Sequence, residues 1–198
     1  MTVTAADKSK AYDGSAYSPF TSTITGYVNS ETIAVVTGTP TYSGTAAAAV
    51  NFGTYAITPV VTGLSATNYT FTPADGSLQI NKVALTVTAD AKSKVYGETN
   101  PALTIHYSGW QNTDGIADLT TAPTSCTLLD ATSPVGVHAN AITVAGGVDE
   151  SYSFTYVAAD FTVTKTMLTV TGALVTSKTY DGSTAATITG ATLTGVVG

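Results

Sequence analysis

The chain has 198 residues and a net charge of −6, with 7 lysines against 13 acidic residues and no arginine. This balance lacks the basic footprint of a nucleic-acid-binding protein and disfavours docking on anionic lipid, so we expect neither partner. Only 10% of the residues are charged and 43% are hydrophobic, which is too apolar for a disordered linker. The helix formers glutamate, lysine, arginine, glutamine and methionine are scarce, whereas threonine, valine, isoleucine and tyrosine are common, so strands should dominate the fold.

The sequence shows no targeting segment and no pair of cysteines. Residues 1–5 are typical of a strand rather than of a secretory signal, and no run of about 18 apolar residues predicts a membrane span. We therefore interpret the chain as an internal piece of a longer protein. The single cysteine, Cys126, cannot form an internal disulfide, and we expect it to be a small, partly buried side chain, as free cysteines usually are. No neighbouring base is present to activate it as a catalytic thiol.

Several sequence markers recur at a near-constant spacing. Thr-Val-Thr followed by Ala or Gly occurs three times, at residues 2–5, 86–89 and 169–172. A Lys-x-Tyr marker follows each copy, and its tyrosines, Tyr12, Tyr96 and Tyr180, are 84 residues apart. Such self-similarity predicts tandem structural units, which we place at residues 1–82 and 83–165, with residues 166–198 as the start of a third unit.

The joints between these units are short. Around Lys82 and Lys165 there is no linker rich in Gly, Pro or Ser, so the last strand of one unit should run directly into the first strand of the next and hold it in a fixed orientation. The partial unit at residues 166–198 should be unable to bury its apolar face alone. It could pack on the second unit, lie disordered, or self-associate by offering its strands to another molecule.

The two complete units have the same predicted elements. An alternating strand with Val3 or Val87 on its apolar face opens each unit, and the Lys-x-Tyr marker leads into a turn. A second strand follows, at residues 21–25 or 103–107. The later strands are predicted at residues 54–60, 68–72 and 77–81 in the first unit, and at 137–145, 152–157 and 160–164 in the second.

One short helix is predicted between the second and third strands of each unit. Asn29 and Asn112 suit its N-cap, and it would cover residues 33–36 in the first unit and 116–119 in the second. We therefore expect a mostly β (α+β) fold. In each unit, a small mixed or antiparallel sheet would bury its apolar face under this helix.

Together, the markers resemble the MBG and YDG repeat domains, which occur in tandem in very large bacterial surface proteins, adhesins and haemagglutinin-like proteins. The resemblance covers residues 1–165 and rests on (Leu/Met)-Thr-Val-Thr-Ala, Lys-Ser-Lys-x-Tyr, Gly-x-Tyr-Ala-Ile-Thr, Asn-Tyr-Thr-Phe-Thr and a closing strand with a lysine. His138-Ala139-Asn140 interrupts the third of these markers in the second unit. Residues 166–198 look like the first part of a YDG-type unit. The resemblance implies tandem β-grasp-like units that act as spacers in an extracellular stalk, with no catalytic residues.

The acidic residues and histidines offer little chemistry. His106 and His138 lie on different elements without an obvious carboxylate partner, so we interpret both as surface residues rather than metal ligands. The acidic pairs are Asp114 with Asp118 and Asp149 with Glu150. They could form a general acid–base pair or hold a single calcium ion between units, although they lack the dense oxygen spacing of a calcium loop. We predict no cofactor.

The recurring tyrosines and lysines have structural interpretations. Tyr12, Tyr96 and Tyr180 should be packed rings whose hydroxyls find a nearby partner, and Trp110, which replaces Tyr27 in the second unit, should pack in a core or groove. Lysines near strand ends raise the hypothesis of Lys–Asn isopeptide bonds. The candidates are Lys82, Lys94, Lys165 and Lys178, but their flanks are polar. An intact mass equal to the sequence mass would exclude such bonds, because each one releases ammonia.

These observations favour a structural module of a bacterial cell-surface adhesin, whose partners are the neighbouring units of the same chain. Two other functions stay open: a module that binds a glycan or a protein, and a fibre subunit that donates strands through residues 166–198. We expect no enzyme, because no nucleophile, base and orienting residue occur together.

Overall fold

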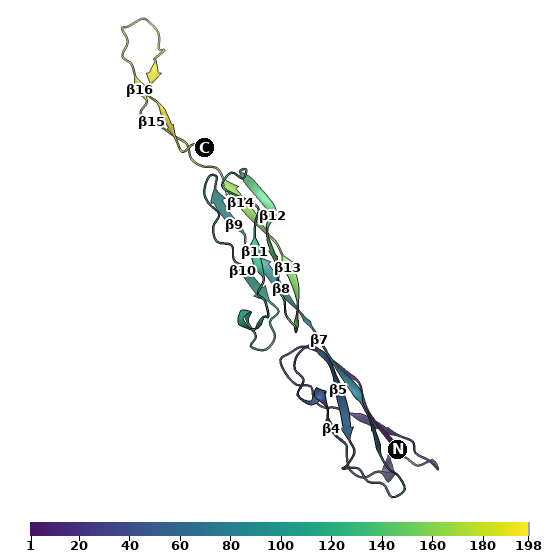
Figure 1. Ribbon diagram of the computed structural model, residues 1–198. Coiled ribbons are helices and arrows are strands. Elements are labelled where there is room, and N and C mark those ends of the chain that lie inside the picture. Colours follow the sequence, from purple (N-terminus) through teal and green to yellow (C-terminus); the bar gives the residue numbers. More distant parts are fainter. Residues whose placement is uncertain (198) are drawn as a thin grey trace. The chain divides into compact units, whose positions relative to one another are not determined.

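The computed structural model describes residues 1–197, in which short strands alternate with turns and no residue is α-helical (Figure 1). By their internal contacts the residues fall into two compact units. The first contains Met1–Val87, Tyr107–Pro123 and Gly146–Thr155, and the second contains Thr88–His106, Thr124–Ala145 and Tyr156–Gly198. The first compact unit therefore holds the whole first sequence repeat together with three segments of the second.

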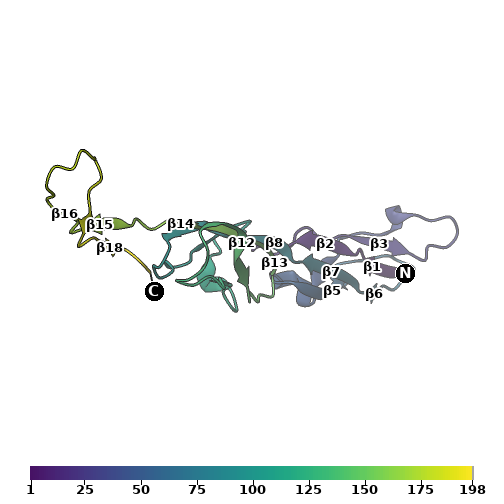
Figure 2. The same ribbon diagram turned by 90° about the horizontal axis from the view of Figure 1, so that it is seen from above.

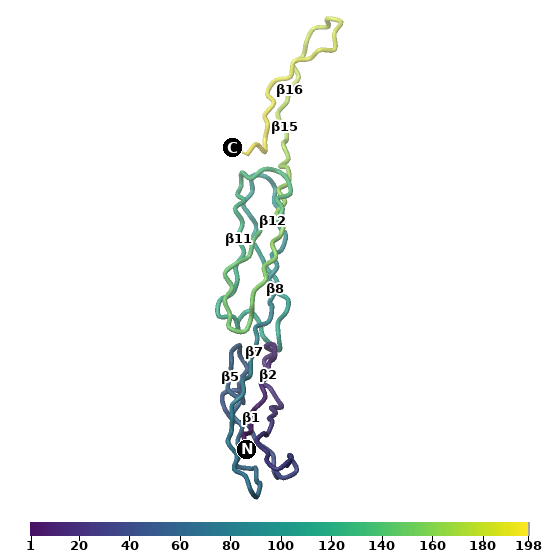
Figure 3. Tube along the Cα trace, turned by 90° about the vertical axis from the view of Figure 1, so that its right-hand side faces the viewer, coloured from purple at the N-terminus to yellow at the C-terminus, as the bar shows by residue number. Residues whose placement is uncertain are grey.

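The strands of the first repeat form two small mixed sheets. In the first sheet the order is β3-β1-β6, with bounds Ser22–Thr25, Thr2–Ala5 and Thr72–Ala74 (Figure 2). In the second the order is β2-β7-β5-β4, with bounds Lys8–Ala11, Gly76–Asn81, Gly53–Val60 and Thr41–Ser43. Figure 3 labels the first three of these strands. The opening strands β1 and β2 run parallel to β6 and β7 respectively, and the other neighbours are antiparallel.

The second repeat has the same strand order as the first. Its three-stranded sheet runs β10-β8-β13, with bounds Ile105–Ser108, Val83–Ala89 and Tyr152–Val157. Its four-stranded sheet runs β11-β12-β14-β9, with bounds Thr124–Cys126, Gly136–Ala145, Ala159–Thr164 and Lys92–Val95. Because each strand occupies the place of its sequence counterpart, the internal repeat is also a repeat of topology.

Equivalent strand positions of the two repeats supply the core. Alternating residues are buried in β1, β5 and β7 and in their counterparts β8, β12 and β14, as the period-two pattern predicted. The buried pairs at matching positions are Val3 with Val87, Ala5 with Ala89, Ile57 with Ile142, Leu78 with Phe161, and Ile80 with Val163. The opening, middle and closing strands of a repeat must therefore all be present before its core is closed.

Residues 166–197 form two short antiparallel ribbons, at the yellow end of the chain in Figure 3. β15 (Thr169–Thr171) pairs with β18 (Thr192–Thr194), and β16 (Leu174–Val175) pairs with β17 (Ile188–Thr189). Val170 is 62% exposed, whereas its counterparts Val3 and Val87 are fully buried. The same strand sequence stays open to solvent here because these residues include no middle or closing strands to cover it.

The short helix predicted in each repeat is confirmed in its position, but its expected length and its packing on the sheet are wrong. A single 3₁₀ turn takes its place, at η1 (Ile33–Val35) and η3 (Ile116–Asp118), and neither turn buries a residue against the sheet. Asn29 and Asn112 are not N-caps, because both have left-handed backbone, with φ of 54° and 50°. Val36 and Leu119 return to extended backbone directly after each turn, which leaves no room for a helix to propagate.

Other elements were displaced or missed. The strand predicted at residues 68–72 is wrong, because β6 begins only at Thr72 and the backbone of Tyr69 instead closes a turn on Ala66. The strands β2, β4, β9 and β11 and the 3₁₀ turn η2 (Thr45–Ala48) were not predicted. Within residues 1–197, no helix has the length and hydropathy that a membrane crossing would need.

Candidate functional site: a tyrosine and carboxylate cluster shared by two repeats

A rigid turn after β2 presents the ring of Tyr12. The amide of Tyr12 continues the strand by donating to Asn81 O at 2.9 Å. The turn that follows is clamped, because Lys10 Nζ bonds Asp13 Oδ1 and Ser15 O, and the same carboxylate oxygen accepts from Ser15 N. Side-chain and backbone bonds therefore hold the direction of the ring from both sides.

Gly14 is required in this turn for two reasons. Its φ of 72° lies in the left-handed region, and a Cβ on it would meet the Asn112 side chain at 2.8 Å. Only glycine allows the turn of the first repeat to approach the loop of the second repeat so closely.

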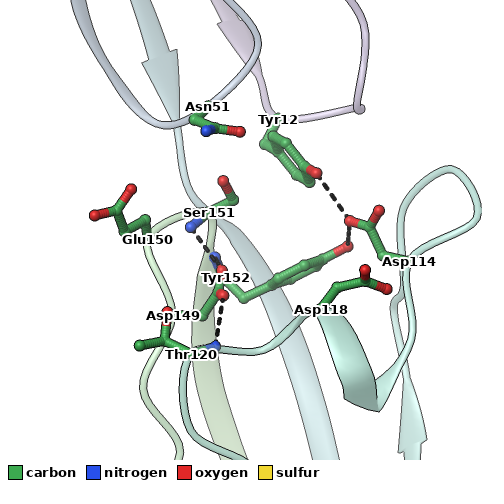
Figure 4. Close-up of a pocket in the computed structure, with 9 residues that line it drawn as sticks. All are labelled: Tyr12, Asn51, Asp114, Asp118, Thr120, Asp149, Glu150, Ser151 and Tyr152. Atoms are coloured by element: carbon green, nitrogen blue, oxygen red, sulfur yellow. Dashed lines mark hydrogen bonds between the residues drawn. The ribbon is translucent and has the colours of Figure 1, made fainter.

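The acceptor for Tyr12 comes from the second repeat. Asp114 lies in the loop before η3, and Tyr152 is the first residue of β13. Asp114 Oδ2 accepts hydrogen bonds from the Tyr12 hydroxyl at 2.9 Å and from the Tyr152 hydroxyl at 2.7 Å (Figure 4). The Tyr152 hydroxyl in turn accepts from Gln111 N at 2.9 Å. One carboxylate thus joins a phenol from each repeat, and all of these residues lie within the first compact unit.

Aromatic packing encloses the two phenols. Tyr12 is 9% exposed and Tyr152 3% exposed. Their rings meet edge to face, with centroids 5.6 Å apart and planes at 76°. The centroid of the Trp110 ring lies 5.4 Å from that of Tyr152, also in an edge-to-face arrangement. Packing of Tyr12 confirms the prediction of a buried ring with a bonded hydroxyl, and packing of Trp110 confirms its predicted place among core side chains.

The environment holds both phenols in their protonated form. Burial, together with the hydrogen bond to Asp114 and the nearby acidic charges, raises the pKa of Tyr12 to about 12. Burial and the bond to Asp114 also raise the pKa of Tyr152 well above its usual range. At neutral pH both groups therefore donate hydrogen bonds, and neither is a phenolate nucleophile.

The other acidic residues near the cluster hold backbone in place. Asp149 Oδ1 accepts from the amides of Ser151 at 2.7 Å and Tyr152 at 3.0 Å, which orients the start of β13. Asp118 Oδ2 accepts from the amide of Gly115 at 2.7 Å and closes η3. With Tyr12, Asn51, Asp114, Thr120, Glu150, Ser151 and Tyr152 they line a pocket of about 190 Å³. Within residues 1–197, no three His, Cys, Asp or Glu side chains are grouped so that they could hold a metal ion.

The structure separates the remaining candidates from this cluster. His106 does have a carboxylate partner, contrary to our expectation, because its Nδ1 lies 2.7 Å from Asp90 Oδ1. Hydrogen bonds from Thr104 and His106 hold the pKa of Asp90 below its usual range. His138 Nε2 lies 2.8 Å from Pro134 O. Cys126 is exposed, so its predicted partial burial is wrong; the short strand β11 directs its side chain towards the Thr143 hydroxyl at 3.3 Å.

Three of the recurring marker residues have surroundings that differ from the prediction. The Tyr96 hydroxyl makes no hydrogen bond within residues 1–197, so the predicted bonded hydroxyl is wrong there. Tyr180 is 94% exposed, so the prediction of a packed ring is wrong there, because no acceptor lies beside it in the described residues. Lys94 is 5% exposed and lies 6.0 Å from the centre of the Phe161 ring, so its surroundings are less polar than its flanks indicated. Its ammonium group bonds the backbone carbonyls of Glu98 and Asp130.

The first repeat contains a pair that our sequence comparison did not connect. The Tyr69 hydroxyl donates to Glu31 Oε2 and accepts from Val28 N at 3.1 Å. Glu31 and Asp114 each follow a glycine, Gly26 or Gly109, by five residues, and Tyr69 and Tyr152 each precede a phenylalanine by two. The recurrence of an acid and a tyrosine at both matched positions was the signal available in the sequence.

Comparison with known families agrees with this repeat organisation. A model of the MBG domain (YGX type) matches the chain twice, at residues 1–79 and 85–162, and the two matches together cover well over half of it. No curated protein matches the chain. Both matches lie inside the units placed at residues 1–82 and 83–165, and the third segment lies outside them. Two matches, each with the same order of strands, identify the chain as a member of the MBG domain family of the YGX type.

Proposed function

We propose that this chain is a structural repeat module of a bacterial cell-surface adhesin, in which tandem units form an extracellular stalk that projects a binding region from the cell. The observation that carries this proposal is the cluster of Tyr12, Asp114 and Tyr152, in which one carboxylate bonds a phenol from each of two successive repeats. A contact that joins neighbours, with no reactive group in it, suits a load-bearing role better than a catalytic one.

The junction of the two repeats supports the same role. Only Lys82 separates the end of β7 at Asn81 from the start of β8 at Val83. Lys82 Nζ donates to Asp149 O at 2.8 Å and lies 5.2 Å from the centre of the Phe52 ring, so this residue is held by both repeats. A one-residue joint with tethered side chain limits bending far more than a flexible linker would.

We further propose that each repeat is a β-grasp-like unit without catalytic activity. The parallel pairing of opening strands with closing strands, β1 with β6 and β2 with β7, supports the β-grasp assignment because it places both ends of the repeat side by side in a mixed sheet. The protonated phenols of Tyr12 and Tyr152 and the carboxylates of Asp118 and Asp149, which accept from backbone amides, support a non-catalytic module.

Two experiments test the stalk. Small-angle scattering of the purified chain should give an extended profile, and a compact globular profile would contradict the proposal. Antibodies against this chain should label intact, unpermeabilised cells of the source bacterium. Labelling that requires permeabilisation would overturn the extracellular location while leaving the fold unaffected.

A glycan- or protein-binding adhesion module is the second candidate. A groove of about 620 Å³ lies beside β3 and η1, and half-buried Tyr27 contributes an aromatic face to it. Aromatic faces commonly stack on apolar faces of ligands. Binding on a glycan array that is lost in Tyr27→Ala would favour this function. Trp110→Ala is a poor test, because that ring packs against Tyr152.

Exposed apolar strands favour the third candidate, a strand-donating fibre subunit. Leu174, Val175 and Ile188 are all more than half exposed on the β16–β17 ribbon. Size-exclusion chromatography over a concentration series, with and without residues 166–198, separates this function from a simple stalk. Identical monomer elution of both forms would reject strand donation.

A further inference from the structure

The acceptor site that Tyr12 fills in the second repeat has a copy in the first repeat. In the second repeat, Tyr152 donates to Asp114 and accepts from the amide of Gln111. In the first, Tyr69 donates to Glu31 and accepts from the amide of Val28. Val28 and Gln111 occupy matched places in the repeat, two residues after Gly26 and Gly109. The whole hydrogen-bonded arrangement is therefore repeated, with glutamate in place of aspartate.

The two copies differ in occupancy. Asp114 accepts a second phenol from the preceding repeat, whereas Tyr69 is the single side-chain donor to Glu31 within residues 1–197. Tyr152 is buried under Tyr12, but Tyr69 is only half-buried. Glu31 and Tyr69 face a pocket of about 260 Å³ that Val35, Thr67 and Asn68 also line. The copy in the first repeat is therefore an acceptor without its second donor.

The surface around the empty acceptor also matches. Asn112 packs against Gly14 of the Tyr12 turn and has a left-handed backbone. Asn29, its counterpart in the first repeat, has nearly the same φ, 54° against 50°, and is exposed. The first repeat therefore presents both parts of the contact, the acid–tyrosine pair and the asparagine that lies against the glycine of the turn.

The donor turn is preformed even where it has no acceptor. Lys178 Nζ donates to Asp181 Oδ1 at 2.9 Å and to Ser183 O at 3.0 Å, which repeats the clamp of the Tyr12 turn. Tyr180, carried on this turn, points into solvent and is 94% exposed. A Tyr-Asp-Gly turn thus holds its tyrosine outwards before any partner arrives, which lowers the ordering cost of docking.

We propose that the pocket at Glu31 and Tyr69 is a docking site for the tyrosine of a Tyr-Asp-Gly turn, carried by a repeat of this kind placed directly before residue 1 in the same polypeptide. Tyr12 precedes Asp114 by 102 residues. A preceding copy of the 82-residue repeat would place its tyrosine at about the same distance from Glu31. This inference rests on the proposed function in one respect, since it treats the repeats as successive members of an array.

The test uses the full chain extended at its N-terminus by a second copy of residues 1–82. The added copy carries Tyr69→Phe, so that each chain contains one Tyr69 at the proposed site. Nitration with tetranitromethane, mapped by mass spectrometry of the digested protein, measures the exposure of each tyrosine. The added tyrosine should dock on Tyr69 and donate a charge-assisted hydrogen bond to Glu31. That bond should keep Tyr69 covered for most of the time, and so lower its labelling rate about tenfold relative to the unextended chain. Tyr152, already covered, should react slowly in both and is the internal reference.

A matched control identifies the group responsible. Tyr12→Ala in the added copy alone should return Tyr69 to its rate in the unextended chain. Equal labelling of Tyr69 with and without the added repeat would overturn the proposal, as would protection that persists in this control. Protection of Tyr69 in the unextended chain that rises with protein concentration would assign the site to a second copy instead. The labelling does not depend on where the parent protein resides, so its failure is distinct from failure of the stalk proposal.

Discussion

Removing the hydroxyl of Tyr12 tests directly whether the cluster couples the two repeats. Tyr12→Phe keeps the ring and its edge-to-face contact with Tyr152 but deletes the 2.9 Å bond to Asp114. Hydrogen bonds to charged groups contribute about 1.5–3 kcal/mol, and Asp114 keeps its second donor at 2.7 Å, so no buried charge is left unpaired. We therefore expect the free energy of unfolding to fall by about 1.5–2 kcal/mol.

The assay and the control both come from the chain itself. Trp110 is the single tryptophan and packs 5.4 Å from Tyr152, so its fluorescence during urea unfolding reports on this cluster. Tyr96→Phe is the matched control, because the Tyr96 hydroxyl has no hydrogen-bond partner in residues 1–197. Its effect should stay within about 0.5 kcal/mol. Equal destabilisation by Tyr12→Phe and Tyr96→Phe would refute the coupling role of Asp114.

Three further predictions concern pH, the turn and the core. Because the folded pKa of Tyr12 is raised to about 12 from 10.0, the stability it contributes is present below pH 10 and is lost as the pH rises towards 12, so Tyr12→Phe should flatten the alkaline arm of a stability–pH curve. Gly14→Ala should lower the melting temperature more than Gly182→Ala, since both glycines have positive φ but only Gly14 meets a neighbouring side chain at 2.8 Å; equal shifts would contradict the close-approach argument. Val3→Ala should cost about 2 kcal/mol or more in chemical unfolding, whereas Val170→Ala, at a 62% exposed position, should cost less than about 0.5 kcal/mol.

Repetition made much of the fold predictable. Successive side chains of a strand face opposite sides of the sheet, so an alternation of apolar and polar residues can be recognised from neighbouring residues alone. The strands around Val3, Ile57 and Leu78 were therefore predicted to within a residue or two of their bounds. The same reasoning applied to Val87 and Phe161 in the second repeat. Two copies of one pattern also supported each other, which an isolated pattern cannot do.

The prediction was wrong where a residue type suits two different backbone conformations. Asn29 and Asn112 suit an N-cap, but among residues other than glycine asparagine is also enriched in left-handed backbone, which it adopts here. Ile33 and Ile116 therefore begin single 3₁₀ turns rather than a helix. Tyr69 sits in a β-favourable stretch, yet its hydroxyl bond to Glu31 fixes it in a turn instead.

By itself, the sequence determined the period of the repeat, the alternating strands and the residues that recur, because these depend on neighbours along the chain. It marked Tyr12 and Asp114 separately, without a reason to connect them. Only the tertiary structure decided that these two side chains, 102 residues apart, share a hydrogen bond. It also decided that Tyr180, on the equivalent turn near the end of the chain, is exposed and has no such partner among residues 1–197. The reason is physical: burial and hydrogen bonding of a tyrosine depend on what the fold brings against it, and an identical turn is a joint in one place and an open surface in another.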